Sequence, residues 1–176
     1  MAGFALNLGH RPTKTGHRAA TKIMNKRSAG ILLYRFKSTS IEVLLVHPGG
    51  PFWKNKDNGA WSVPKGEFTD EDPLAAAIRE FREETGTLLD GKFIPLSPVK
   101  QKSGKIIFAF AQEKDLDITQ IVSNHFEIEW PPRSAKKESF PEIDKAAWFS
   151  PVQAKEKLNP AQAILIDELL SYLKIV

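Results

Sequence analysis

Two apolar stretches near the beginning of the chain, SAGILLYRF (28–36) and IEVLLVHPG (41–49), are separated by the polar tetrapeptide KSTS. Apolar runs of this length, joined by a few polar residues, predict the two strands of a β-hairpin. The segment that follows, 50–59, is rich in Gly, Asn and Asp, which favour turns. We therefore expect a hairpin followed by a loop.

The hydrophobic period changes to that of a helix after this loop. Apolar residues recur every three or four positions and predict a buried stripe: Leu74, Ala77, Ile78 and Phe81. Asp72 followed by Pro73 is typical of an N-cap and a first helical position, and Gly86 is typical of a C-terminal cap. The strand in AWSVPKGEF is expected to enter this helix through a turn at Pro64 and Gly66.

The remaining pattern predicts both strands and helices. We expect strands at 92–101 and 105–113 around a turn at 103–104, an irregular stretch at 124–144, a short strand at 146–150, and helices at 151–158 and 160–176. The core residues of the last helix are expected to be Ile164, Leu165, Leu169, Leu170 and Leu173. Strands and helices mixed without regular βαβ spacing indicate an α/β or α+β fold, with helices sandwiching a sheet.

Composition narrows the class of protein. The chain has 176 residues, 41% of them hydrophobic and 26% charged, which is ordinary for one soluble globular domain with an appendage. The absence of cysteine excludes disulfides, thiolate zinc sites and cysteine nucleophiles, and it fits a cytoplasmic protein. No apolar run approaches the roughly 20 residues of a membrane span. The net charge of +4 favours anionic partners.

The N-terminal segment is basic. No acidic residue precedes Glu42, whereas residues 1–27 contain six basic ones: Arg11, Lys14, Arg18, Lys22, Lys26 and Arg27. The segment is interpreted as a flexible extension or a start-site artefact, because Met24 opens a plausible domain, as a transit-type peptide, or as an anion-binding arm. We expect it to have no catalytic role, with the folded domain at 28–176.

Acidic residues crowd the second half of the predicted helix. In REFREETG (79–86), Glu80, Glu83 and Glu84 lie at i, i+3 and i+4, so their carboxylates share one face and repel each other. A hard cation such as Mg²⁺, which prefers oxygen ligands, would offset this repulsion. The alternative is a solvated acidic face in which Arg79 and Glu83 form an i,i+4 pair.

The segment GEFTDEDPLAAAIREFREETGT (66–87) resembles the Nudix box, G-x5-E-x7-R-E-U-x-E-E-x-G-U, where U is a bulky apolar residue. The matching residues are Gly66, Glu71, Arg79, Glu80, Phe81, Glu83, Glu84 and Gly86. Two departures occur, since four residues instead of five separate Gly66 from Glu71, and Thr87 replaces the last apolar residue. The resemblance covers roughly residues 28–173 and implies a Nudix α/β/α sandwich, with a mixed sheet between helices.

The resemblance implies an enzyme that hydrolyses phosphoric anhydrides. Its substrate would be a nucleoside diphosphate linked to another group, and its cofactor would be Mg²⁺, with Mn²⁺ able to substitute. WSVPKGE (61–67) is similar to the entry of diadenosine-polyphosphate hydrolases and related bacterial pyrophosphohydrolases, so a dinucleoside polyphosphate or an RNA 5′ end is the alternative substrate. A non-catalytic nucleotide-binding module is the alternative of another class, but it should show a broken acid cluster. A small-molecule nucleotide is favoured over nucleic acid as the partner.

Roles for individual residues follow from the resemblance. Glu80 and Glu84 would be the firmest metal ligands, and the carbonyl of Gly66 would help to hold the metal. Glu83 would ligate the metal or position the attacking water. Arg79 would orient the carboxylates, and the residue that matches Glu71 commonly braces that arginine.

Residues outside the box are weaker candidates. Lys65 is the only lysine in the turn before the helix and is the first candidate for a phosphate contact, and Lys54 in the preceding loop is another. Glu142 lies just before the last predicted strand, where it would serve as a metal ligand or base, or remain a solvated loop residue. Four aromatic residues in loops would stack on a nucleobase or simply pack: Phe52, Trp53, Phe126 and Trp130.

Overall fold

The computed structural model describes residues 26–175 and contains nine strands and three α-helices. The strands are β1 (Arg27–Lys37), β2 (Ser40–Pro48), β3 (Lys65–Phe68), β4 (Ile94–Pro95), β5 (Val99–Lys100), β6 (Ile106–Glu113), β7 (His125–Glu129), β8 (Lys137–Pro141) and β9 (Ile143–Phe149). The helices are α1 (Pro73–Thr85), α2 (Pro151–Lys157) and α3 (Ile164–Tyr172), with 3₁₀ turns η1 (Ile118–Gln120) and η2 (Pro160–Gln162). Residues 1–25, which make up most of the expected basic extension, lie outside the described residues, and Arg27 already belongs to β1.

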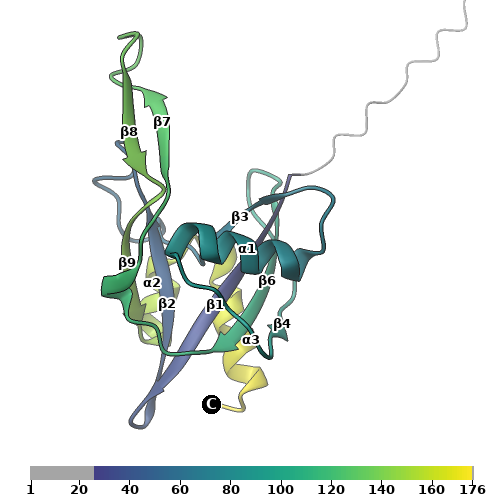
Figure 1. Cartoon of the computed structure of the whole chain (residues 1–176). Coiled ribbons are helices and arrows are strands. Elements are labelled where there is room, and N and C mark those ends of the chain that lie inside the picture. Colours follow the sequence, from purple (N-terminus) through teal and green to yellow (C-terminus); the bar gives the residue numbers. More distant parts are fainter. Residues whose placement is uncertain (1–25, 176) are drawn as a thin grey trace, which may run out of the picture.

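A mixed sheet of seven strands forms the centre of the fold; five of them follow the order β4-β6-β1-β2-β9, and β3 and β5 pair with β1 and β6 (Figure 1). Strand β1 runs parallel to β6 and antiparallel to β2 and β3, and β5 pairs with β6. The predicted hairpin of β1 and β2 is confirmed. One helix, α1, covers one face of the sheet, while α2 and α3 cover the other, which confirms the predicted sandwich (Figure 1).

The alternation of side chains along β1 supplies both halves of the core. Ile31 and Leu33 pack in one cluster with Phe81 of α1, whereas Leu32 and Tyr34 pack in the other with residues of α2 and α3. Neighbouring residues of a strand point to opposite faces, so a central strand between two helical layers must be apolar at nearly every position. This explains the continuous apolar run of β1.

Both ends of α1 are capped as predicted. The side chain of Asp72 accepts hydrogen bonds from the backbone N–H groups of Leu74 and Ala75, both at 3.0 Å. At the other end, Gly86 has φ +74°, a left-handed conformation that glycine adopts without steric penalty. The buried face of the helix fixes its rotation, so that Glu80 and Glu84 lie beside β3 at the border of the core.

The segment predicted to be irregular, 124–144, was wrongly interpreted. Most of it forms a two-stranded hairpin, β7 and β8, in which Phe126 pairs with Phe140 and Ile128 pairs with Glu138. The hairpin projects from the body of the protein (Figure 1). The alternation in HFEIE was a strand signal, but Pro131 and Pro132 at the tip interrupt the sequence pattern of an ordinary hairpin.

A turn was predicted at Pro64 and Gly66, and this prediction is wrong for Gly66. Strand β3 begins at Lys65, and Gly66 lies opposite Ala29 of β1. The hydrogen-bond ladder between β1 and β3 extends to Pro64, because the N–H of Ile31 donates to the Pro64 carbonyl at 3.0 Å. Gly66 therefore serves a purpose other than turning the chain.

The last predicted helix is divided in two. Its first residues form η2, and α3 begins only at Ile164. Leu165 and Leu169 are buried as predicted, whereas Ile164 is 59% exposed and the prediction for it was wrong. Helix periodicity starts anew at α3, so Ile166 takes the buried position instead. In the part of the chain that the structure describes, no helix is long and apolar enough to cross a membrane.

Candidate active site

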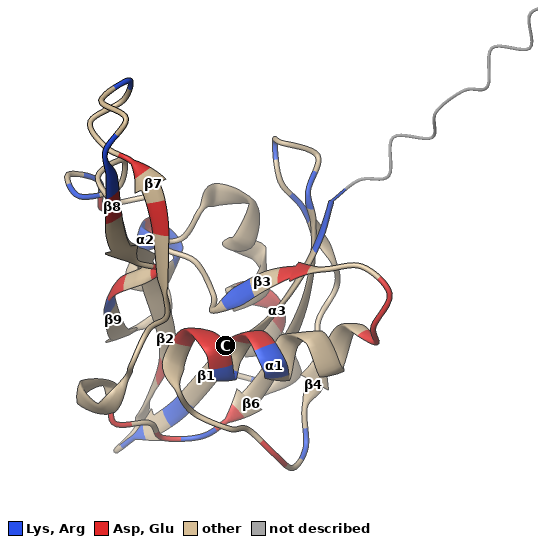
Figure 2. Ribbon diagram, turned by 45° about the horizontal axis from the view of Figure 1, so that its top comes forward, with Lys and Arg blue, Asp and Glu red and all other residues tan. Residues whose placement is uncertain are grey.

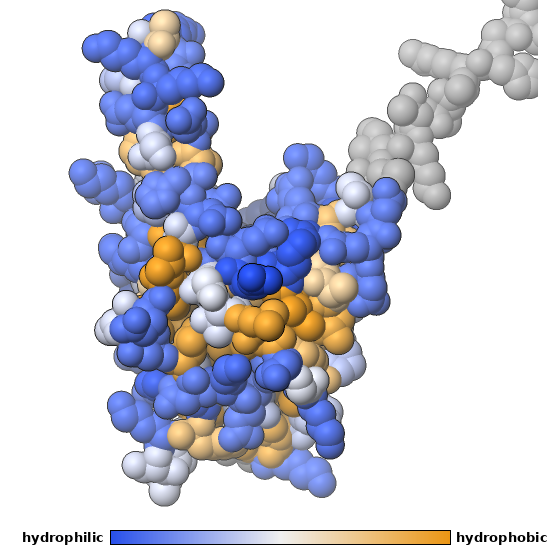
Figure 3. All heavy atoms as spheres, in the orientation of Figure 1, coloured by the Kyte–Doolittle hydropathy of each residue, from blue (hydrophilic) through white to orange (hydrophobic). Residues whose placement is uncertain are grey.

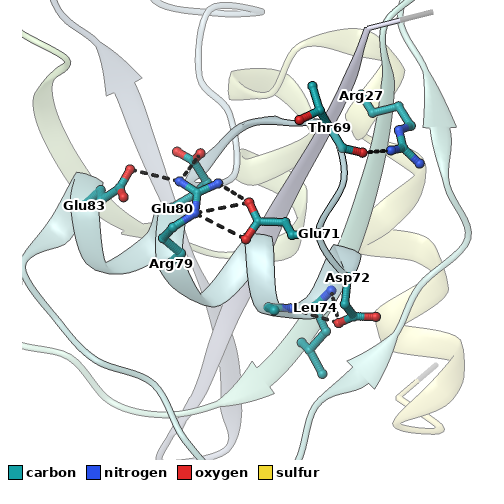
Figure 4. Close-up of polar contacts among 9 residues, drawn as sticks. Arg27, Thr69, Glu71, Asp72, Leu74, Arg79, Glu80 and Glu83 are labelled. Atoms are coloured by element: carbon teal, nitrogen blue, oxygen red, sulfur yellow. Dashed lines mark hydrogen bonds and ion pairs between the residues drawn. The ribbon is translucent and has the colours of Figure 1, made fainter. Parts of the chain in front are cut away.

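Arg79 is the centre of a network of carboxylates on and near α1 (Figure 4). Its guanidinium donates to Glu71, to Glu80 at 2.6 Å and to Glu83 at 3.1 Å. These hydrogen bonds, that to Glu71 above all, raise the pKa of Arg79 above its ordinary value. The arginine therefore stays charged and holds three carboxylates in fixed directions.

Glu80 lies directly over Gly66 of β3. A Cβ atom added to Gly66 would lie 1.7 Å from Glu80 Oε2 and 1.9 Å from Glu80 Cδ, so no side chain fits there. The need for glycine at this position thus comes from the close approach of Glu80 and not from turn geometry. The glycine lets a helix carboxylate rest against the backbone of the neighbouring strand.

Glu84 lies one helical turn further and is tied to the same strand. Its Oε2 accepts a hydrogen bond from the backbone N–H of Lys65 at 2.8 Å. Two successive residues of β3 therefore contact two acids of α1 that lie one helical turn apart. Burial lowers the pKa of the Lys65 amine, which lies close enough to Glu84 and Glu80 for their charges to oppose this shift.

The two carboxylates are only partly compensated. The pKa of Glu84 is raised to about 8, mainly by burial; Lys65 opposes this rise, and the charges of Glu80 and Glu142 contribute to it. Burial also raises the pKa of Glu80, although Arg79 lowers it. The site thus disfavours its own negative charge until a further cation arrives.

Glu142 joins the cluster from a distant part of the sequence. It lies between β8 and β9, and its charge raises the pKa values of both Glu80 and Glu84. Its backbone is fixed on both sides, since its N–H donates to the Asn124 carbonyl at 2.8 Å and its carbonyl accepts from Gly49 at 2.9 Å. The exposed side chain is thereby held beside the acidic face of α1.

A cavity of about 260 Å³ lies beside this cluster. Lys65, Glu84 and Glu142 contribute to its wall, and so do residues from three other segments: Trp53, Gln101 and Asn159. The cavity therefore joins the acidic cluster to aromatic and amide side chains. The sequence did not indicate Gln101 or Asn159, because single amides in loops have no spacing that marks a site.

The other candidate residues are distributed more widely. Lys54 is exposed and is not among the described residues that line the cavity. Phe52 packs edge-to-face on Trp130, with ring centroids 5.4 Å apart, and Phe126 lies against Gly50. Of these four aromatic residues, only Trp53 lines the cavity within the described chain.

The shortened loop leaves the contacts of the motif intact. Although four residues separate Gly66 from Glu71, the latter still reaches Arg79, and Gly66 still lies under Glu80. Thr87, at the second departure, is partly buried and donates its N–H to Thr85 Oγ1 at 3.2 Å. A polar residue at this position is thus accommodated at the end of α1.

The donors suit a magnesium ion that brings some of its own ligands. Within residues 26–175, no group of three acidic or histidine side chains is arranged to hold a metal ion by itself. Arg79 donates hydrogen bonds to Glu80 and Glu83, and the N–H of Lys65 donates to Glu84. Mg²⁺ usually keeps several waters and binds through one or two carboxylates together with substrate phosphates. The undercompensated pair of Glu80 and Glu84 fits such an ion.

The raised pKa of Glu84 makes the metal-free protein less stable at higher pH. The folded state keeps a proton on Glu84 up to about pH 8, whereas the unfolded chain releases it near pH 4.5. The free energy of unfolding in EDTA should therefore fall as the pH rises from about 5 to 8. Urea unfolding at pH 5, 6.5 and 8 measures this slope, which should be smaller in Glu84→Gln. Equal slopes in the two proteins would contradict the assignment.

Comparison with solved structures shows the same fold in several proteins. A C. elegans Ap4A hydrolase in a binary complex is 18% identical, with 85% of this chain and 98% of that chain covered and a TM-score of 0.54. A mutT/nudix family protein from Listeria innocua is 20% identical, with 85% and 94% covered and a TM-score of 0.57. The NUDIX domain of Shewanella oneidensis NrtR, complexed with ADP ribose, is 13% identical, with 85% and 89% covered and a TM-score of 0.57.

Comparison by sequence identifies the family. No curated protein sequence matches the chain. The family model of the NUDIX domain matches residues 24–169, which is most of the chain and includes every strand and α1. The chain therefore belongs to the NUDIX domain family, the hydrolases of phosphoric anhydrides that the motif in α1 predicted.

Proposed function

We propose that the protein catalyses the Mg²⁺-dependent hydrolysis of a diphosphate linkage in a nucleoside diphosphate derivative. The observation that carries this proposal is the meeting of Glu80, Glu84 and Glu142 beside a cavity that also contains Lys65. Carboxylates and a partly buried lysine suit a substrate whose oxygens bind both a metal ion and an ammonium group. Nucleotide phosphates meet both requirements.

Each residue of the cluster has a distinct task in this proposal. Glu80 and Glu84, with the carbonyl of Gly66, hold the metal, and Arg79 keeps Glu80 and Glu83 in place. When bound, Mg²⁺ supplies Lewis-acid stabilisation of the charge that develops on the phosphate oxygens. Mn²⁺, which also accepts oxygen ligands, is expected to substitute.

Two further residues act on the substrate and on water. Lys65 lines the cavity, and its amine is assigned to a phosphate oxygen of the substrate. Glu83 orients the attacking water, and Glu142 takes its proton as a general base. Water attacks phosphorus in line, and the bond between that phosphorus and the bridging oxygen breaks. Each of the two products then carries at least one phosphate group.

Two of the structural neighbours agree with a nucleotide as the partner. One neighbour is complexed with ADP ribose and another is an Ap4A hydrolase, so this fold accommodates nucleosides joined through phosphate bridges. We extend this class of ligand to the present protein. A nucleotide substrate and a chain without cysteine also fit a cytoplasmic location, which we include in the proposal.

A substrate panel tests the proposal. Turnover of nucleoside triphosphates, ADP ribose and Ap4A is expected to vanish in EDTA and to return with Mg²⁺ or Mn²⁺. Ca²⁺, which is larger and does not demand octahedral geometry, should support it poorly. In ¹⁸O-labelled water, the label should appear on a phosphate of the former bridge. Faster release of phosphate from a simple monoester than from every bridged nucleotide would contradict the proposed reaction.

A further inference from the structure

His47, near the end of β2, is buried between two hydrogen-bond acceptors. Its side chain is 1% exposed, with Nδ1 2.7 Å from Asp144 Oδ1 and Nε2 2.8 Å from the carbonyl oxygen of Lys56. An ionised carboxylate and a carbonyl only accept hydrogen bonds, so the ring donates to both when each of its nitrogens carries a proton. A ring bonded at both nitrogens has one orientation, and it joins β2 to β9 and to the loop after β2.

An irregularity in the sheet brings Asp144 to the ring. The register of β2 and β9 shifts there, since His47 pairs with Lys145 but its neighbour in β2 pairs with Ile143. Asp144 is therefore the extra residue of a β-bulge. Bulges next to a site change the direction of the side chain of the unpaired residue, and here that side chain reaches the buried ring.

The Nε2 contact fixes the loop of residues 50–57, which we call the Trp53 loop. The N–H of Lys56 donates to the Trp53 carbonyl at 2.8 Å, so the residue that the ring holds is itself bonded to Trp53. In the part of the chain that the structure describes, His47 makes the one hydrogen bond that joins residues 51–56 to a residue outside the loop. A buried ring therefore determines where the exposed part of this loop lies.

The Trp53 loop forms part of the cavity wall. Trp53 lines the cavity together with Lys65 and Glu84, whereas His47 is not among the described residues that line it. The loop lies beside the base of the β7–β8 hairpin (Figure 1), and Figure 2 shows the acidic half of α1, in red, at the helix end nearer that hairpin. In the space-filling view, a hollow lies between the hairpin and the rest of the surface above α1 (Figure 3). Because Trp53 belongs to the wall, a displacement of the loop changes the shape of the cavity.

The groups that we assign to catalysis do not depend on the ring. Glu80 and Glu84 lie against β3, and Glu142 is held by backbone hydrogen bonds at both its N–H and its carbonyl. None of these contacts involves His47 or the Trp53 loop. Removal of the ring should therefore displace the loop and leave the reacting groups in place.

We propose that His47 is a positioning residue for substrate binding. Its hydrogen bond to the Lys56 carbonyl holds the Trp53 loop against the cavity, so that Trp53 meets a nucleotide bound at the acidic cluster. His47 acts through the loop and touches neither the substrate nor the reacting atoms. The inference rests on the proposed function and adds a residue that sets how tightly the nucleotide binds. An interaction that stabilises bound substrate and transition state equally affects KM and not kcat.

His47→Asn and His47→Gln separate the two contacts of the ring. The amide nitrogen of asparagine lies near the position of Nδ1 and donates to Asp144, whereas that of glutamine lies near Nε2 and donates to the Lys56 carbonyl. In His47→Asn, KM for the bridged nucleotide that the wild type hydrolyses fastest should rise at least about fivefold, as for one lost hydrogen bond, with kcat within about twofold. His47→Gln keeps the bond to the loop, so both constants should stay within about twofold of the wild type.

Two further variants distinguish positioning from a general loss of stability. Gln112→Met is the matched control, since Gln112 is also buried, donates to the carbonyls of Asp90 and Lys92 in another loop, and does not line the cavity within the described chain. It should lower the melting temperature and leave KM unchanged. Trp53→Ala, in an exposed loop, should raise KM at unchanged kcat. Adding His47→Asn to it should change KM less than about twofold, because both residues act through one contact.

Hydrogen exchange of the backbone amides in the Trp53 loop gives a readout that does not need turnover. Exchange should be faster in His47→Asn than in the wild type and normal in His47→Gln. Equal KM values in the two His47 variants, normal exchange in His47→Asn, or a normal KM in Trp53→Ala would overturn the inference and leave the proposed function standing. A wild type that hydrolyses no bridged nucleotide would instead remove the proposed function, and the inference with it.

Discussion

Glu84→Gln is expected to lower kcat at least about 100-fold at saturating Mg²⁺, the scale seen when one placed electrostatic group is removed from an active site. Glutamine keeps an oxygen that accepts the hydrogen bond from Lys65 N–H, so the contact between α1 and β3 remains. The variant loses only the negative charge that we assign to metal binding. The free energy of unfolding in EDTA at pH 8 should be equal or higher, because a destabilising buried charge is gone.

The same change at Glu83 tests the residue that we assign to the positioning of water. Glu83→Gln should also lower kcat about 100-fold, although Glu83 is tied only to Arg79 in this structure. Glu156→Gln, an exposed acid on α2, is the control and should retain normal turnover. Steady-state kinetics with varied Mg²⁺ measures all three variants. Near-normal kcat in Glu83→Gln or Glu84→Gln would refute the site assignment.

Gly66→Ala is expected to have an effect on kcat of similar size, about 100-fold, through a single methyl group. The new Cβ would lie less than 2 Å from the Glu80 carboxylate, so that side chain must leave its place against β3. Overpacking of this kind costs about 1–3 kcal/mol in stability. The melting temperature should fall by about 2–4 °C per kcal/mol, and the protein remains folded at the assay temperature.

Gly104→Ala separates loss of stability from displacement of Glu80. Gly104 has φ +85°, so alanine strains the turn between β5 and β6 without approaching the acidic cluster. This variant should lose stability but keep kcat within about twofold of the wild type, since no group that we assign to catalysis moves. Thermal unfolding and steady-state kinetics on both glycine variants make the comparison. Equal kcat values in the two would show that Gly66 has no special relation to Glu80.

Local sequence information was sufficient for α1 and its charged face. Capping at Asp72 and Gly86 depends on residues within one turn of each helix end, and the apolar stripe fixes the helix rotation. The same applies to the hairpin of β1 and β2, whose strands are adjacent in sequence. These elements could be predicted because the interactions that form them are short in sequence.

Tertiary contacts determined what the sequence did not predict. Strand β3 begins at Lys65 because β1 offers a free edge there, which no local signal reveals. Gln101 and Asn159 reach the cavity only after the β5–β6 turn and the chain beyond α2 fold against the sheet. The position of Ile164 on the surface likewise depends on the break between η2 and α3.

The backbone contacts of Glu142 keep this carboxylate in place independently of the tip of the β7–β8 hairpin. The two ends of the β7–β8 hairpin are fastened to each other and to Gly49, so Glu142 is set at the base while the tip extends outward. Residues can be added to, removed from or exchanged at the tip without moving the carboxylate. Substitutions in the tip of the hairpin can thus change which molecules bind during evolution, while the reacting groups of the site stay the same.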